Sequence, residues 1–118
     1  MSYRISKTFT FDAAHHLPHL PDGHKCARPH GHTYTVCVEL RSYDLNENGF
    51  VVDYGELDEF KRYIDEHLDH RDLNEVFDFP TTAENLAKHL FFWCTSRWPE
   101  TFMVGVSETP KTWAWFLF

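Results

Sequence analysis

The chain has 118 residues, of which 42% are hydrophobic and 17% are aromatic, and its formal net charge at pH 7 is -7. This length predicts a single domain over residues 1–118, and the acidic balance argues against a nucleic-acid partner, which needs a basic surface. No apolar run approaches the roughly 18 residues that would span a membrane, and the first residues contain no apolar signal region, so a cytoplasmic protein is expected.

The first two predicted elements are strands separated by a long loop. Phe9 and Phe11 alternate with polar residues in a strand over about residues 3–14. The next segment, from His15 to Pro29, is rich in proline and histidine, and loops of this length in a compact domain are usually functional or disordered. A second strand is predicted from about His30 to Tyr43, which is rich in Thr, Tyr and Val.

Two helices are predicted after a turn at residues 46–49. Asp53 and Glu56 form a capping-box pattern that opens the first helix. Its apolar positions recur at helical spacing, namely Leu57, Phe60, Ile64 and Leu68. Thr81 and Glu84 form a second such pattern before a helix with a broad apolar face.

The last predicted elements are two strands, over about residues 102–108 and 112–118. The order is therefore two strands, two helices and two strands, which indicates an α+β fold with a mainly antiparallel sheet. The order of the elements alone does not determine how the strands pair.

The sharpest local signal is His30-Gly31-His32 at the start of the second strand. Residues two apart in a strand point to the same face, so both imidazoles project together, as two ligands of one metal must. Imidazole suits zinc among the common metals, and His15, at the end of the first strand, is the best third ligand. Three His ligands leave one coordination position for water or substrate, as in catalytic zinc sites.

Other interpretations of these histidines stay open. A His-x-His pair can be an ordinary exposed pair at the start of a strand, although the adjoining His-rich loop favours a metal site. His16 is a rival third ligand, but it would point away from His15 in an extended segment. Substrate contact and plain solvation both fit His19 and His24.

The three cysteines differ in their surroundings. An odd number at wide spacing makes a poor disulfide framework. Cys37 and Cys94 lie in apolar runs and are expected to be small buried hydrophobes. Cys26 lies among basic residues, which favour the reactive thiolate form. Because it precedes His30 by four residues, it is either a fourth metal ligand or a catalytic thiolate near a metal-bound substrate.

Two acidic positions are candidates for the remaining chemistry. Asp69-His70 can supply the acid–base partner that a catalytic thiolate needs, because a carboxylate that orients an imidazole makes a proton shuttle. Adjacent side chains rarely hydrogen-bond to each other, so a charge pair at the end of a helix is the favoured alternative. Glu108 can accept two parallel N–H bonds from a heterocycle, or it is simply a solvated charge at the end of a strand.

Five stretches, spread over nearly the whole chain, carry a resemblance to one family. They are residues 11–15 (FDAAH), 26–32 (CARPHGH), 68–70 (LDH), 80–85 (PTTAEN) and 107–109 (SET). Together, and in this order, they resemble the 6-pyruvoyltetrahydropterin synthase and 6-carboxytetrahydropterin synthase superfamily. Five independent matches are far more specific than any one of them.

The resemblance implies the tunnelling fold, in which ββααββ subunits, with two helices on one face of the sheet, join their sheets into a barrel. It implies a homohexamer of two stacked trimers with active sites at subunit interfaces. The implied zinc ligands are His15, His30 and His32. The implied catalytic set is Cys26, Asp69 and His70, with the cysteine from a different subunit than the other two. The implied pterin contacts are Glu108, with Thr82 and Glu84 as further candidates.

Within the superfamily, the short spacing from Cys26 to His30 resembles the bacterial 6-carboxytetrahydropterin synthases of queuosine and 7-deazaguanine biosynthesis. The implied substrate is 7,8-dihydroneopterin triphosphate, and the implied products are 6-carboxy-5,6,7,8-tetrahydropterin, acetaldehyde and triphosphate. A pyruvoyl-type synthase, which eliminates triphosphate but keeps the side chain, is the nearest alternative. A non-catalytic zinc or pterin-binding module is another, although it would not need a proton-transfer set.

Two features depart from the family pattern. His16 stands where bacterial members often have Arg, and the terminal segment, residues 113–118, is unusually aromatic. Because the net charge of the protein is -7, local cations must bind the triphosphate. The candidates, which the sequence does not rank, are Lys25, Arg28, His24 and Lys111.

Overall fold

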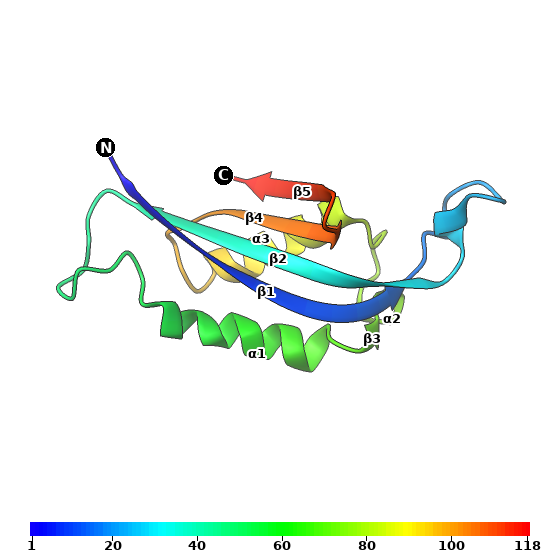
Figure 1. Cartoon of the computed structure of the whole chain (residues 1–118), viewed down its shortest axis with the longest axis horizontal. Coiled ribbons are helices and arrows are strands. Elements are labelled where there is room, and N and C mark those ends of the chain that lie inside the picture. The colour runs from blue at the N-terminus through cyan, green and yellow to red at the C-terminus, as the bar shows by residue number, and fades with distance from the viewer.

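The computed structural model describes all residues from 1 to 118 and is built on one five-stranded sheet with the order β3-β1-β2-β4-β5 (Figure 1). β1 (Tyr3–His15) and β2 (His30–Ser42) form a long antiparallel pair. β4 (Thr101–Thr109) and β5 (Thr112–Leu117) continue the sheet in antiparallel order. β3 (Arg71–Asp72) runs parallel to the end of β1.

Helices cover one face of this sheet. α1 (Asp58–His67) packs against β1, and α3 (Ala83–Thr95) lies against β4 and β5 (Figure 1). The short helix α2 (Leu73–Val76) follows β3 directly, and two 3₁₀ turns, η1 (Lys25–Ala27) and η2 (Tyr54–Leu57), lie in the connections. No helix is both long enough and apolar enough to cross a membrane.

The core forms because alternate residues of the three central strands are apolar and face the helices. These buried strand residues are Phe9, Phe11, Ala13, Tyr34, Val36, Val38, Leu40, Val104 and Val106. On the helix side, Phe60 of α1 meets the ring of Phe9 at 5.2 Å between centroids. The other face of the sheet carries no helix, and Cys37 on that face is only half-buried. The expectation of a buried Cys37 is therefore wrong, whereas Cys94 is buried as predicted.

The α+β class and the mainly antiparallel sheet are confirmed, and the structure adds elements that the sequence did not indicate. β3 and α2 have two and four residues, too few to show a period of 2 or 3.6. They lie where a single connection between two helices was expected, and they add a parallel strand at the edge of the sheet.

Both predicted capping boxes are wrong in detail. Asp53 accepts a hydrogen bond from the backbone N–H of Gly55 at 2.9 Å and opens η2, so the α-helix begins only at Asp58. Thr82, rather than Thr81, caps α3 by accepting from the N–H of Asn85 at 3.2 Å. Either threonine satisfies the local sequence preference, and a tertiary contact of the first one, described below, decides between them.

Replacement of Phe60 tests the core between α1 and β1. Its side chain is fully buried against Phe9 and Trp93. Phe60→Ala should lower the free energy of unfolding by about 3–5 kcal/mol because it leaves a cavity, and urea denaturation measures this. Arg62→Ala, on the exposed side of the same helix, should change it by less than about 0.5 kcal/mol. Equal values for the two variants would contradict the described packing.

Candidate metal centre

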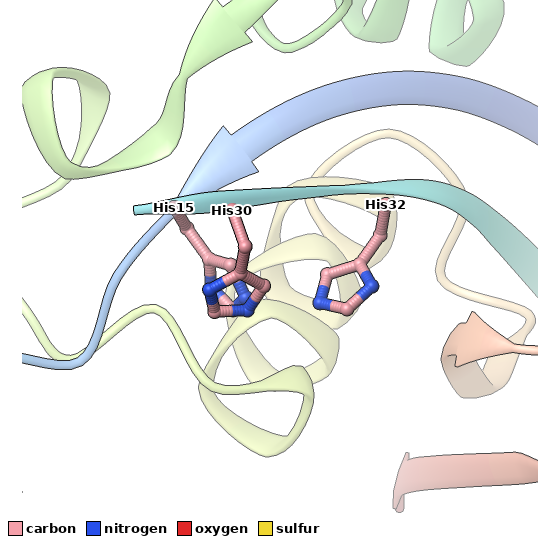
Figure 2. Close-up of side chains that lie close together, drawn as sticks. All are labelled: His15, His30 and His32. Atoms are coloured by element: carbon pink, nitrogen blue, oxygen red, sulfur yellow. The ribbon is translucent and has the colours of Figure 1, made fainter. Parts of the chain in front are cut away.

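The pairing of β1 with β2 brings the three predicted metal ligands together. His15 is the direct cross-strand partner of His30, and His32 lies opposite Ala13. All three imidazoles project to the same side of the two strands, at the end of the sheet (Figure 2). One ligand nitrogen from each of the three lies within 4.8 Å of the others. This convergence of three nitrogen donors could hold a metal ion.

Backbone carbonyls select the tautomer of two of these histidines. His15 Nδ1 lies 2.9 Å from the carbonyl oxygen of Thr81, and His30 Nδ1 lies 2.7 Å from that of Arg28. A carbonyl oxygen only accepts, so each Nδ1 carries the proton and donates it. In the neutral form of each ring, Nε2 therefore presents a lone pair. Metal-binding histidines are oriented in this way by a bond from the other ring nitrogen.

The far side of the histidine group ends at a carboxylate. Glu108 Oε2 lies 3.2 Å from His15 Nε2 and 3.1 Å from His32 Nε2, and both nitrogens are buried without a hydrogen-bond partner. A lone pair of neutral His15 thus faces a carboxylate oxygen, and a cation among them would satisfy both. Burial lowers the pKa of His32, which favours its neutral, ligating form. The donor set therefore fits a metal ion.

These contacts also revise the expectations for individual residues. Glu108 is not a freely solvated charge at the end of a strand, because it touches two of the histidines and is 29% exposed. Thr81, expected only as a helix cap, is fully buried, and its carbonyl holds His15. No local pattern in the sequence indicates that contact. His16 lies outside the convergent group; its backbone is bound by the side chain of Asn74 instead.

Cys26 lies in η1, beside the histidines rather than among them. The backbone N–H of Cys26 donates a hydrogen bond to the His24 side chain at 3.1 Å. The carbonyl of Cys26 accepts one from the N–H of Leu17 at 2.8 Å. Its side chain is partly exposed and lines a pocket of about 530 Å³ together with His30 and His32. Cys26 is absent from the convergent donor group, which does not support its reading as a fourth ligand.

Asp69 and His70 form the contact that adjacent side chains rarely make. His70 Nδ1 lies 2.9 Å from Asp69 Oδ2. The left-handed backbone of His70, with φ at 58°, permits it. β1 holds this turn twice: Asp12 donates its N–H to Asp69 Oδ1 at 2.9 Å, and its carbonyl accepts from the N–H of His70 at 2.6 Å. The charge pair expected at the end of the helix is therefore present just after α1, and its two side chains are in direct contact.

The other two predicted site residues lie at the start of α3. The side-chain oxygen of Thr82 caps the helix by accepting a hydrogen bond from the N–H of Asn85. Glu84, in the first turn, is exposed. Both follow Thr81 closely in the sequence, and the carbonyl of Thr81 contacts His15.

Comparison with known proteins gives a consistent result. The family model described as 6-pyruvoyl tetrahydropterin synthase matches residues 4–117. A 6-carboxy-5,6,7,8-tetrahydropterin synthase of Haemophilus influenzae is 36% identical over 117 residues, covering 75% of this chain and 79% of that protein. One of Bacillus subtilis is 35% identical over 98 residues, covering 76% and 64%. An Archaeoglobus fulgidus protein that provisionally carries the same name is 35% identical over 111 residues, covering 93% and 91%.

Solved structures share the whole fold. The 6-pyruvoyl tetrahydropterin synthase of Caenorhabditis elegans superposes with a TM-score of 0.87 at 27% identity, covering all of this chain and 96% of that one. A 6-pyruvoyl tetrahydropterin synthase of Plasmodium vivax, at 19% identity, has a TM-score of 0.75 over 98% of this chain and 97% of its own, which shows the fold alone.

Removal of one histidine tests the metal centre. His30→Ala should weaken metal binding by at least about 100-fold, since loss of a group that only orients a metal ligand already costs about 10–100-fold. Metal content after dialysis and a chelator competition measure the change. His19→Ala, a loop histidine outside the convergent group, should keep full metal content. Equal retention in both variants would exclude the site.

The Asp69–His70 contact predicts a pH response. The hydrogen bond to Asp69 raises the pKa of His70 above 6.5, and the bond from the Asp12 N–H, followed by that to His70, lowers the pKa of Asp69. The ion pair is therefore intact between these two pKa values: Asp69 is protonated below the lower one, and His70 loses its proton above the upper one.

Asp69→Asn should return the pKa of His70 towards 6.5, measured by NMR titration of the imidazole. Asp65→Asn is the matched control, because Asp65 pairs with Lys61 instead. An unchanged pKa in Asp69→Asn would show that the contact does not persist in solution.

Proposed function

Because this chain belongs to the 6-pyruvoyl tetrahydropterin synthase family, we propose that it is a zinc-dependent 6-carboxytetrahydropterin synthase, a carbon–carbon lyase of queuosine and 7-deazaguanine biosynthesis. Its substrate is 7,8-dihydroneopterin triphosphate, and its products are 6-carboxy-5,6,7,8-tetrahydropterin, acetaldehyde and triphosphate. The observation that carries the proposal is the convergence of His15, His30 and His32 beside the pocket of Cys26. The names of the relatives and the short spacing from Cys26 to His30 support the carboxy type.

Zinc is the proposed metal, held by His15, His30 and His32. Three neutral imidazoles suit it, and a site with three protein ligands keeps one position for substrate. When bound, the ion supplies Lewis-acid polarisation of a side-chain oxygen of the substrate, which acidifies the neighbouring C–H bonds.

Protein side chains then move the protons. The thiolate of Cys26 removes a proton from the substrate side chain. His70, whose Nδ1 is held by Asp69 at 2.9 Å, exchanges a second proton through its exposed Nε2. Triphosphate leaves by elimination, and the C–C cleavage that releases acetaldehyde takes the second carboxylate oxygen from water. The ring and its side chain exchange oxidation states internally, so no redox cofactor takes part.

Glu108 is the proposed anchor of the pterin ring. Its carboxylate lies beside two metal ligands and is partly exposed, so a ring bound to it keeps its side chain next to the metal. A carboxylate accepts two parallel N–H bonds from the amino-pyrimidine edge. Thr82 and Glu84 are further proposed contacts of the pterin, and they follow Thr81, whose carbonyl holds His15.

The proposed assembly is a homohexamer of two stacked trimers whose sheets join into barrels. β5 is a sheet edge, and the outer edge of β1 is paired only at Ala13 and Ala14. Such unpaired edges pair readily with another chain. β5 also exposes Trp113, Trp115 and Leu117, which a neighbouring subunit would cover. In this assembly Cys26 acts with Asp69 and His70 of an adjacent subunit.

Product analysis tests the reaction. The zinc-loaded protein, incubated with 7,8-dihydroneopterin triphosphate, should release acetaldehyde and triphosphate in equal amounts, measured by an aldehyde assay and ion chromatography. Cys26→Ala should keep its zinc and lose at least about 100-fold in turnover, as expected for a lost proton-transfer group. Cys37→Ala, on the open face of the sheet, is the matched control and should retain activity.

The outcomes separate the alternatives. Triphosphate without acetaldehyde would identify a pyruvoyl-type synthase, and neither product would indicate a non-catalytic binding module. Loss of zinc from Cys26→Ala would make this cysteine a ligand rather than a proton acceptor.

A further inference from the structure

Most cations of this acidic protein are already paired. Of the 11 lysine and arginine side chains, five form ion pairs with carboxylates, and Arg71 donates to the backbone carbonyl of Glu66. The paired ones are Arg4, Lys7, Arg41, Lys61 and Arg97. The remaining cations, which have no ion-pair or hydrogen-bond partner for their charged groups, are Lys25, Arg28, Arg62, Lys88 and Lys111.

The positions of these free cations differ. Arg62 and Lys88 lie on α1 and α3, and Lys111 lies in the turn between β4 and β5. Only Lys25 and Arg28 line the pocket of about 530 Å³ that also contains the Cys26 thiol.

That pocket is electropositive by composition. Its other lining residues are Pro29, His30 and His32, so none of the residues that form its wall is a carboxylate. The pocket of about 630 Å³ that also touches His32 is different: its wall includes the carboxylates of Asp12 and Asp72 as well as His70 and Arg71. An anion is therefore favoured in the first of these pockets, where no carboxylate opposes the cations.

The backbone that carries the two cations is tied to the metal centre. The carbonyl of Arg28 accepts the bond from His30 Nδ1 at 2.7 Å, and the N–H of Arg28 donates to the carbonyl of Lys25 at 3.3 Å. The carbonyl of Cys26 accepts from Leu17, just after β1. Both side chains remain exposed. Both side chains are therefore free to bind a ligand, while the backbone that carries them is positioned by the contact with His30.

We propose that Lys25 and Arg28 bind the triphosphate of the substrate, and that they rank above His24 and Lys111 for this role. The proposal rests on the proposed function, because it names the site for the leaving group of that reaction. A guanidinium donates two parallel hydrogen bonds to two phosphate oxygens, and an ammonium adds a point charge. Because the two residues flank Cys26, a triphosphate held there lies beside the thiol proposed to remove the proton.

The two other candidates fit less well. His24 uses its Nδ1 to accept the N–H of Cys26 and cap η1, and it does not line the pocket. Lys111 is exposed in a hairpin turn and does not line it either. Arg62 and Lys88 serve as matched controls, since each is an unpaired cation of equal charge on a helix.

The test compares two ligands that differ only in the phosphates, 7,8-dihydroneopterin triphosphate and 7,8-dihydroneopterin. Binding is measured by fluorescence, at times short compared with turnover, on the zinc-loaded Cys26→Ala protein, whose turnover is expected to be at least about 100-fold slower. Lys25→Gln and Arg28→Gln, added singly, should each lower the affinity for 7,8-dihydroneopterin triphosphate by about 10-fold, which corresponds to the loss of one charge-assisted hydrogen bond. Affinity for 7,8-dihydroneopterin and zinc content should stay constant. The loss should shrink as salt is added.

Arg62→Gln and Lys88→Gln in the same background should change both affinities by less than twofold. Equal weakening of both ligands by the Lys25 and Arg28 variants, or no weakening of either, overturns the proposal. If the parent binds both ligands equally tightly, the triphosphate site is wrong while pterin binding stands. If the parent binds neither ligand, the proposed function itself fails, and this inference fails with it.

Discussion

The register of the β1–β2 pair is the constraint on which the rest of the structure depends. Phe11 lies opposite Tyr34, and four pairs further on His15 lies opposite His30. Side chains alternate along a strand, so the burial that directs Phe11 to the helices directs His15 to the same face. A slip of one residue would turn the apolar side chains to the open face and separate the histidines. Core burial and metal-site assembly are thus fixed by one pairing.

The site begins where this apolar core ends. Tyr34 stacks on Phe11 at 4.8 Å between ring centroids and meets the rings of His15 and His32 edge-on, at 6.0 and 5.4 Å. Beyond it, the groups facing the histidines are polar: the Thr81 carbonyl, the Arg28 carbonyl and the Glu108 carboxylate. An apolar floor therefore packs against the imidazoles on one side, and polar groups orient them on the other, as bonds from outer groups orient metal-binding histidines.

The segments that carry the proposed acid–base groups are held by hydrogen bonds to the backbone. η1, which carries Cys26, is fastened to Leu17 and to the Arg28–His30 contact, and the Asp69–His70 turn is fastened to Asp12. The left-handed residue in that turn costs free energy, of order 1–3 kcal/mol for such strain. It places the imidazole on its carboxylate and in contact with solvent. The strain is thus located in a pair for which a catalytic role is proposed.

Much of this protein follows from local sequence. Alternation of apolar residues predicted β1, and a high content of Thr, Tyr and Val predicted β2. Helical spacing predicted α1, and a broad apolar face after a capping pattern predicted α3. The period of 2 in a strand predicted that His30 and His32 would share a face. The family was recognisable from short motifs distributed along the chain, and the match over residues 4–117 confirms it. These features depend on spacing along a few residues, which the sequence displays directly.

Only the tertiary structure decided the contacts between distant segments. Thr81 contacts His15 across 66 residues, and Glu108 contacts two histidines of β1 and β2. The ion pairs of the other lysines and arginines show which cations remain free. The same holds for the choice of Thr82 as cap and for β3, which exists because α1 returns the chain to the edge of β1. Such contacts depend on the path of the whole chain, and no local period or propensity reports where that path brings two side chains together.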